Sequence, residues 1–258
     1  MKLSACIEWL FSDETDDFAQ RIHLAKKAGL DAVEFWFWSN KDIDAIEAAL
    51  RETGLSLSGF VAEPMIALTD AANREKFLSG LDDSIATARR LGAKVLIAQA
   101  GNDLPGVSRE DQHRALVETL KGAADKLAGT GVRLGVEPLN TLIDHQGYYL
   151  SSTRDALNIV DQVGRPEIGI VYDLYHSYVM GEGIEDVLGD RVSRVVHAHV
   201  ADHPGRSDPG TGEIDLGRRL AWLFANGYDG PVGLEYRPSG STAEALPGVV
   251  ARLTNPQS

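Results

Sequence analysis

The chain has 258 residues, 43% of them hydrophobic and 24% charged, which is the composition of a globular protein with a sizeable core. Its formal net charge of −13 disfavours binding to phosphate backbones, so we do not expect a nucleic-acid partner. Cys6 is the single cysteine, which excludes an internal disulfide and favours a cytoplasmic location. The N-terminal segment lacks a signal-peptide pattern, and no apolar run is long enough to predict a membrane span.

In the first half of the chain, β-branched and aromatic runs alternate with segments whose apolar residues recur at helical spacing. Phe18, Ile22 and Ala25 show that spacing. Ser108 with Asp111 resembles a capping box at the start of a helix. The predicted units, in chain order, are strand 3–9 with helix 15–30, strand 32–38 with helix 41–54, strand 56–62 with helix 73–92, and strand 93–100 with helix 108–127.

The second half repeats the pattern. Its predicted units are strand 132–140 with helix 151–164, strand 168–176 with helix 183–194, strand 195–202 with helix 215–227, and strand 230–238 with a helix over 241–253 that Pro247 interrupts. Eight strand–helix units without a dividing linker predict an α/β fold, a single (β/α)8 TIM barrel domain over residues 1–258. A doubly wound open sheet would usually carry a glycine-rich turn after its first strand, whereas residues 10–17 read LFSDETDD.

Active sites of such barrels lie at the C-terminal ends of the strands. Since alternate residues of a strand face opposite sides, His197 and His199 are expected to point into the barrel while Val196 faces the helices. The same alternation in neighbouring strands predicts that four of them end in an inward ionisable side chain: Glu137, Asp173, His199 and Glu235.

Three carboxylates in one barrel mouth would repel one another unless they took up protons or a cation neutralised them. A divalent metal bound by Glu137, Asp173, His199 and Glu235 is the simplest resolution. Oxygen-rich ligation favours Mn²⁺ or Mg²⁺, with Co²⁺ or Zn²⁺ as alternatives. His197, one pleat deeper, is expected either behind the metal ligands or at the substrate. Taken singly, each residue has an ordinary interpretation as a solvated glutamate or a hydrogen-bonded core histidine.

The segments around these residues resemble the hydroxypyruvate isomerase family, which belongs to the wider xylose isomerase-like barrel superfamily together with 2-oxo-tetronate isomerases and ketose 3-epimerases. The resemblance spans nearly the whole chain, and its most specific element is ADHPGRSDPGTGEID at 201–215. The other similar segments are VEPLN at 136–140, YDLYH at 172–176 and GLEYRP at 233–238.

The resemblance implies a metal held by the four residues named above, with Glu137 and Glu235 as the acid–base pair. It also implies that His176 and Arg206 contact substrate oxygens, and His197 is a further substrate-binding candidate. The expected reaction is an aldose–ketose type isomerisation of a small hydroxy-carbonyl acid through a cis-enediolate, with hydroxypyruvate and tartronate semialdehyde as the expected pair.

Two departures from the family pattern leave the substrate open. Hydroxypyruvate isomerases carry Gln at the position of His199, whereas epimerase relatives carry His, and segment 61–76 does not match the usual family loop. The alternatives are therefore a 2-oxo-tetronate isomerase or a ketose 3-epimerase. A non-catalytic sugar-binding barrel and an abasic-DNA endonuclease represent other classes; the first should lack a catalytic carboxylate and the second needs a basic surface. The expected partner is a small molecule, and a homo-oligomer is left open.

Overall fold

A computed structural model describes residues 1–254 of the chain. The strands are β1 (Leu3–Cys6), β2 (Ala32–Glu34), β3 (Ser56–Leu57), β4 (Gly59–Val61), β5 (Val95–Ala98), β6 (Arg133–Val136), β7 (Ile168–Asp173), β8 (Val195–Val200) and β9 (Val232–Leu234). The α-helices are α1 (Phe18–Lys27), α2 (Ile43–Thr53), α3 (Arg74–Leu91), α4 (Arg109–Leu127), α5 (Thr153–Val163), α6 (Leu174–Val179), α7 (Ile184–Leu188), α8 (Leu216–Ala225) and α9 (Thr242–Thr254). Two 3₁₀ turns, η1 and η2, cover Ala71–Asn73 and Val192–Arg194.

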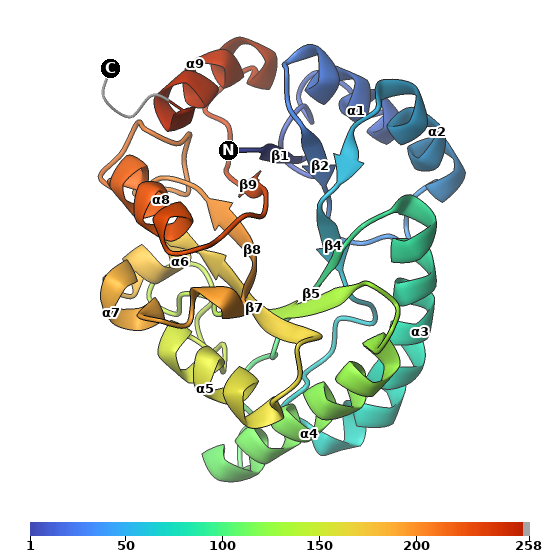
Figure 1. Ribbon diagram of the computed structural model, residues 1–258, viewed down its shortest axis with the longest axis vertical. Helices are drawn as coiled ribbons and strands as arrows, with labels where there is room; N and C mark the ends of the chain where they lie inside the picture. Colours follow the sequence, from blue (N-terminus) through green and yellow to red (C-terminus); the bar gives the residue numbers. More distant parts are fainter. Residues whose placement is uncertain (255–258) are drawn as a thin grey trace.

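All strands of the described residues belong to one parallel sheet, in the order β3-β2-β1-β9-β8-β7-β6-β5-β4. The sheet curves into a ring, and the helices surround it (Figure 1). This architecture confirms the predicted (β/α)8 TIM barrel. The predicted domain continues to residue 258, and residues 255–258 lie outside the described part of the chain. No helix within residues 1–254 combines the length and the apolar character needed to cross a bilayer.

The predicted strand 56–62 is present but divided. Its first part, β3, pairs with β2, and its second part, β4, pairs with β5, with Ser58 between them. The amide of Ser58 donates to the carbonyl of Val33 at 2.9 Å, so the backbone continues along β2 through the division. Because β3 pairs with β2 and β4 pairs with β5, the two edges of the sheet come together at Ser58 and the barrel is nearly closed.

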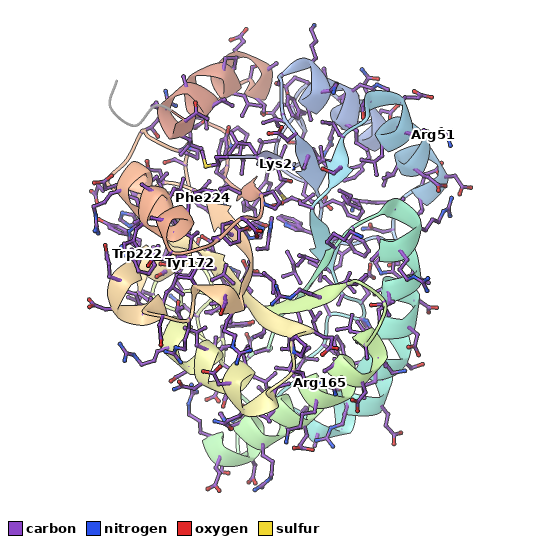
Figure 2. All side chains as sticks on the ribbon, viewed as in Figure 1. Lys2, Arg51, Arg165, Tyr172, Trp222 and Phe224 are labelled. Carbon is purple, nitrogen blue, oxygen red and sulfur yellow. The ribbon has the colours of Figure 1, made fainter. Side chains whose placement is uncertain are left out.

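Two apolar clusters pack the two sides of the sheet. Side chains fill the centre of the ring, whereas Arg51 on α2 points outward (Figure 2). The large cluster lies between strands and helices and includes outward strand residues such as Leu134 and Tyr172. The small interior cluster consists of Val61, Val95, Ile97, Val171 and Val196. This cluster packs inside the ring, and its members Val61 and Ile97 also line a cavity at the C-terminal ends of the strands.

A β-bulge corrects one prediction about β8. Ile170 of β7 pairs with Val195, but the next pair joins Val171 to His197, so Val196 is an extra residue in the ladder. Val196 therefore joins the interior cluster, and the prediction that it faces the helices is wrong. Beyond the bulge the alternation resumes, and His199 pairs with Asp173 of β7.

The predicted strand 168–176 is too long. β7 ends at Asp173, and α6 begins at the next residue. The Oδ1 atom of Asp173 accepts hydrogen bonds from the amides of Tyr175 at 2.8 Å and His176 at 3.2 Å, which is the geometry of an N-cap. Asp173 is thus both the end of a strand and the cap of a helix.

Other helix ends follow the sequence more closely. Ser108 caps α4 by accepting from the amide of Asp111 at 3.1 Å, as the capping-box pattern predicts. The predicted helix 183–194 is divided into α7 and η2, and α9 continues through Pro247 rather than being interrupted there. These helices cover the outside of the barrel and contribute nothing to the polar mouth.

Candidate metal centre and active site

The structure brings the four predicted metal ligands together at the C-terminal ends of neighbouring strands. One ligand atom from each lies within 4.8 Å of the corresponding atoms of the others, and all four residues are buried. Parallel strands place their C-terminal ends on one face of the barrel, which is why residues far apart in the sequence meet here. The four are Glu137 after β6, Asp173 at the end of β7, His199 in β8 and Glu235 after β9.

His199 occupies the centre of this cluster. Its Nδ1 atom lies 3.1 Å from Oε1 of Glu137 and 3.3 Å from Oε2 of Glu235. The indole Nε1 of Trp36 donates to the other oxygen of Glu235 at 2.7 Å, which fixes the orientation of that carboxylate. Nδ1 is therefore the nitrogen that His199 offers to a metal shared with the two glutamates.

Arg206 brings a fixed positive charge to the same place. Its Nη2 atom donates to Oε2 of Glu235 at 2.6 Å and to Oδ2 of Asp173 at 3.1 Å. Its φ angle of 56° is uncommon for a residue with a side chain, so the loop after β8 imposes its orientation. Asp202 orders that loop, because its carboxylate accepts from the backbone amides of His203, Gly210, Gly212 and Ile214.

The electrostatics of the cluster favour added positive charge. Burial raises the pKa of the Glu137 carboxyl, and the nearby charges of Glu235 and Asp173 raise it further, while His199 opposes the rise. Burial alone would lower the pKa of His199, but the carboxylates of Glu235 and Glu34 raise it well above its ordinary value. A cation near Nδ1 of His199 would relieve the repulsion among the carboxylates.

The donor set fits a divalent metal. Glu137, Asp173 and Glu235 supply carboxylate oxygens, and His199 supplies one imidazole nitrogen, all from buried side chains. Oxygen-rich ligation of this kind suits Mn²⁺ or Mg²⁺, and a single imidazole also permits Co²⁺ or Zn²⁺. These four residues would hold the ion.

A cavity of about 400 Å³ opens onto the cluster. Trp9 and Trp36 form part of its apolar wall, with their ring centroids 5.2 Å apart in a T-shaped arrangement. Its size is within the range of small-molecule sites. Four further polar residues that were not predicted from the sequence line the cavity: Gln99, Asp144, His145 and Arg237.

The three predicted substrate contacts do not all reach this cavity. Arg206 lines it, whereas His176 and His197 do not. His176 lies behind the cluster, with Nδ1 accepting from the side chain of Asn140 at 2.6 Å and Nε2 at 3.5 Å from Oδ2 of Asp173. His197 is fully buried and lies behind His199.

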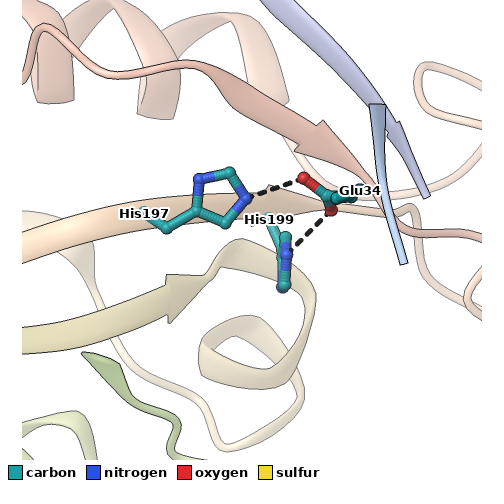
Figure 3. A group of neighbouring side chains, drawn as sticks. All are labelled: Glu34, His197 and His199. Carbon is teal, nitrogen blue, oxygen red and sulfur yellow. Dashed lines mark hydrogen bonds and ion pairs between the residues drawn. The ribbon is translucent and has the colours of Figure 1, made fainter. Parts of the chain in front are cut away.

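Sequence reasoning also missed Glu34, the last residue of β2. Its two carboxylate oxygens face the Nε2 atoms of His197 and His199 at 2.9 and 3.0 Å (Figure 3). Its carboxyl pKa is lowered, because the two histidines outweigh the effect of burial, which alone would raise it. The available signal was an acidic residue inside the aromatic strand 32–38, since buried carboxylates are rare unless paired.

Comparison with known proteins agrees with the barrel fold. The family model described as "Xylose isomerase-like TIM barrel" matches residues 22–252. The chain belongs to this family.

Within the xylose isomerase-like family, the chain is similar to small-molecule isomerases. It is 31% identical to the hydroxypyruvate isomerase of Escherichia coli over 95% of this chain and 97% of that protein. It is 29% identical to the 2-oxo-tetronate isomerase of Pectobacterium atrosepticum over 95% of each chain. A crystal structure described as an AP endonuclease, family 2, from Brucella melitensis is 28% identical, with a TM-score of 0.90 over 96% of this chain and 98% of that one. The expected resemblance to hydroxypyruvate isomerases is thus confirmed.

Proposed function

We propose that this xylose isomerase-like barrel is a metal-dependent isomerase of a small hydroxy-keto acid, with hydroxypyruvate and tartronate semialdehyde as the first candidates. The proposal depends on one observation above all: Glu137 and Glu235 both line the cavity and both belong to the cluster of metal-ligating side chains. Similarity to the E. coli hydroxypyruvate isomerase along 95% of the chain supports the same class of substrate.

The proposed reaction moves a proton between adjacent carbons and needs no external oxidant or reductant. One of the two glutamates, Glu137 or Glu235, removes the proton from the hydroxymethyl carbon of hydroxypyruvate, which yields a cis-enediolate. The other glutamate, initially protonated, delivers a proton to the former carbonyl carbon. The hydroxyl proton moves from the oxygen of the hydroxymethyl carbon to the former carbonyl oxygen, and tartronate semialdehyde results. A divalent metal bound at the cluster would supply Lewis-acid polarisation of the carbonyl.

The remaining polar groups of the cavity suit an acid substrate. A substrate carboxylate requires a positive partner, and the buried guanidinium of Arg206 lines the cavity beside the cluster. Arg237 adds a second positive charge at the cavity wall. His176 is too deep to reach a substrate in this structure, and its contact with Asp173 supports a role in orienting that ligand instead.

Two related reactions share the same groups. A 2-oxo-tetronate is a longer keto acid, and the similarity to the P. atrosepticum isomerase favours it as the second candidate. A ketose 3-epimerase would use the same two carboxylates on opposite faces of a sugar. A non-catalytic sugar-binding barrel would not need both glutamates. The net charge of −13 disfavours an abasic-DNA endonuclease.

Proton exchange in D₂O, followed by NMR with metal-loaded protein, tests the proposal. The panel consists of hydroxypyruvate, 2-oxo-tetronates and free ketoses, with Glu137→Gln as the inactive control and a DNA duplex containing an abasic site as a separate assay. We expect deuterium at the hydroxymethyl carbon of hydroxypyruvate together with tartronate semialdehyde. Exchange confined to C3 of a ketose would identify an epimerase, and DNA cleavage without any exchange would contradict the isomerase proposal.

A further inference from the structure

We infer that Glu34 is a positioning residue for the metal centre: it holds His199 so that Nδ1 faces the metal ligands, and it thereby increases the affinity for the divalent cation. The inference rests on the metal site of the proposed function and is independent of the substrate. Glu34 does not line the cavity, so it acts through His199 rather than on a bound molecule.

The two ring nitrogens of His199 have different partners. Nε2 lies 3.0 Å from Oε1 of Glu34, and Nδ1, on the other side of the ring, lies 3.1 Å from Oε1 of Glu137. A carboxylate beside Nε2 keeps a proton on that nitrogen, which leaves the Nδ1 lone pair for a metal. The imidazole thus connects a carboxylate behind the site to the carboxylates within it.

Glu34 is itself held in place by a buried polar network. Its Oε2 atom accepts from the hydroxyl of Ser58 at 2.8 Å and lies 2.9 Å from Nε2 of His197. Ser58 in turn shares a hydrogen bond with Ser4 at 2.7 Å. The Oε2 atom of the carboxylate is therefore held by Ser58 and His197, and His197 acquires a function without touching a substrate.

A glycine leaves the space that this carboxylate occupies. Gly233 of β9 pairs with His199 of β8 and with Ser4 of β1. A Cβ atom at this position would clash with Oε1 of Glu34, would lie 2.8 Å from its Oε2 and would lie 2.6 Å from Cδ2 of His199. Because Gly233 has no side chain, the barrel wall has room for the contact between Glu34 and His199.

A second metal bound by Glu34, His197 and His199 is the competing explanation, since their ligand atoms also lie close together. The 2.9 Å contact between Oε2 and Nε2 of His197 is a direct hydrogen bond, whereas the 3.0 Å contact between Oε1 and Nε2 of His199 is an ion-pair contact without hydrogen-bond geometry. Oε2 of Glu34 already has two hydrogen-bond partners, His197 and Ser58, which disfavours its use as a ligand of a second ion.

Isothermal titration of metal-free protein with Mn²⁺ tests the inference through affinity and stoichiometry. We compare the wild type, Glu34→Gln and the control Glu182→Gln, which removes another hydrogen-bonded glutamate that contacts Thr153 and Ser177 but no metal ligand. We expect one ion per chain and a Kd raised about 10- to 100-fold in Glu34→Gln, with the wild-type value in the control. ¹⁵N NMR of labelled His199 with diamagnetic Mg²⁺ should show the proton on Nε2 in the wild type.

An unchanged Kd in Glu34→Gln, or two ions per wild-type chain with one lost in this variant, would overturn the inference. If Glu34→Gln does not fold, Ser58→Ala removes one donor to the same carboxylate; a smaller rise in Kd supports the inference, and wild-type affinity contradicts it. A wild type that binds no cation refutes the metal centre and the role of Glu34 together. Normal metal binding without isomerase activity would count against the proposed function alone.

Discussion

We propose two functions for Glu137 and Glu235, metal binding and acid–base catalysis, and single substitutions can separate both from folding. Both contribute to the metal cluster and both line the cavity. Glutamine keeps the size of the side chain but cannot accept and return a proton, so we expect turnover to fall about 10²- to 10⁴-fold in Glu137→Gln and in Glu235→Gln. Steady-state kinetics with saturating metal measures the loss, and circular dichroism should show an unchanged fold. A kcat near the wild-type value in either variant would refute its acid–base role.

His199 predicts how the metal-free protein responds to pH. Its pKa is raised in the folded state, so its contribution to stability is complete below the ordinary histidine pKa of about 6.5 and is lost as pH rises toward the folded-state value. The free energy of unfolding should therefore decrease above about pH 6.5, by up to about 1.4 kcal/mol per pH unit for this one proton. Urea denaturation in the presence of a chelator measures the slope. An equal slope in His199→Gln would show that another group is responsible.

Among individual residues, the sequence predicts the four metal-ligand candidates better than it predicts the residues around them. Strand alternation and the order of the barrel are enough to select Glu137, Asp173, His199 and Glu235, because all four sit at strand ends. Glu34 escapes the same reasoning, because the predicted strand 32–38 places it inside the strand, whereas β2 ends at Glu34 and its importance arises from contacts across the barrel. The depth of His176 depends on the early start of α6, which the sequence pattern does not reveal.

Packing of the strands inside the barrel depends on positions where only glycine fits. Gly135 of β6 faces the interior cluster, and an added Cβ would lie 2.6 Å from Cγ2 of Val196 and 2.8 Å from Cγ2 of Val171. Gly135→Ala should therefore destabilise the protein by about 1–3 kcal/mol through overpacking. Chemical denaturation of metal-free protein measures this change. Gly240→Ala is the matched control, because nothing lies within 4 Å of its added Cβ; equal stabilities of the two variants would contradict the packing assignment.

Two features of the strands cannot be predicted from the hydrophobic pattern, the end of β7 and the bulge in β8. YDLYH reads as a continuing strand, yet the carboxylate of Asp173 caps a helix there and ends the strand. The bulge at Val196 is equally hidden, because valine suits either face of a strand. Local hydrogen bonding and partner register, rather than residue type, decide both features.

The barrel fold as a whole is predictable because the strand–helix repeat runs along the whole chain. Eight strand–helix units leave few alternatives once the glycine-rich turn of an open sheet is missing, and parallel pairing then places every strand end on one face. The division of the third predicted strand at Ser58 does not alter this result, since β3 and β4 occupy one position in the ring.

The proposed metal should stabilise the whole molecule, since its four proposed ligands come from four consecutive strand positions, β6 to β9. An ion that binds only the folded state at 100 times its Kd adds about 2.7 kcal/mol to the free energy of unfolding. We expect a chelator to lower the Tm of the wild type and to leave the Tm of Asp173→Asn nearly unchanged. Differential scanning calorimetry with and without Mn²⁺ provides the comparison, and the same metal-dependent shift in both proteins would place the ion elsewhere.

The most direct test of the metal centre is the anomalous scattering of Mn²⁺ in crystals of the protein. We expect one dominant anomalous peak in contact with Glu137, Asp173, His199 and Glu235, and none between Glu34 and His197. A map without a peak at those four side chains, or with its strongest peak at another part of the barrel, would contradict this expectation.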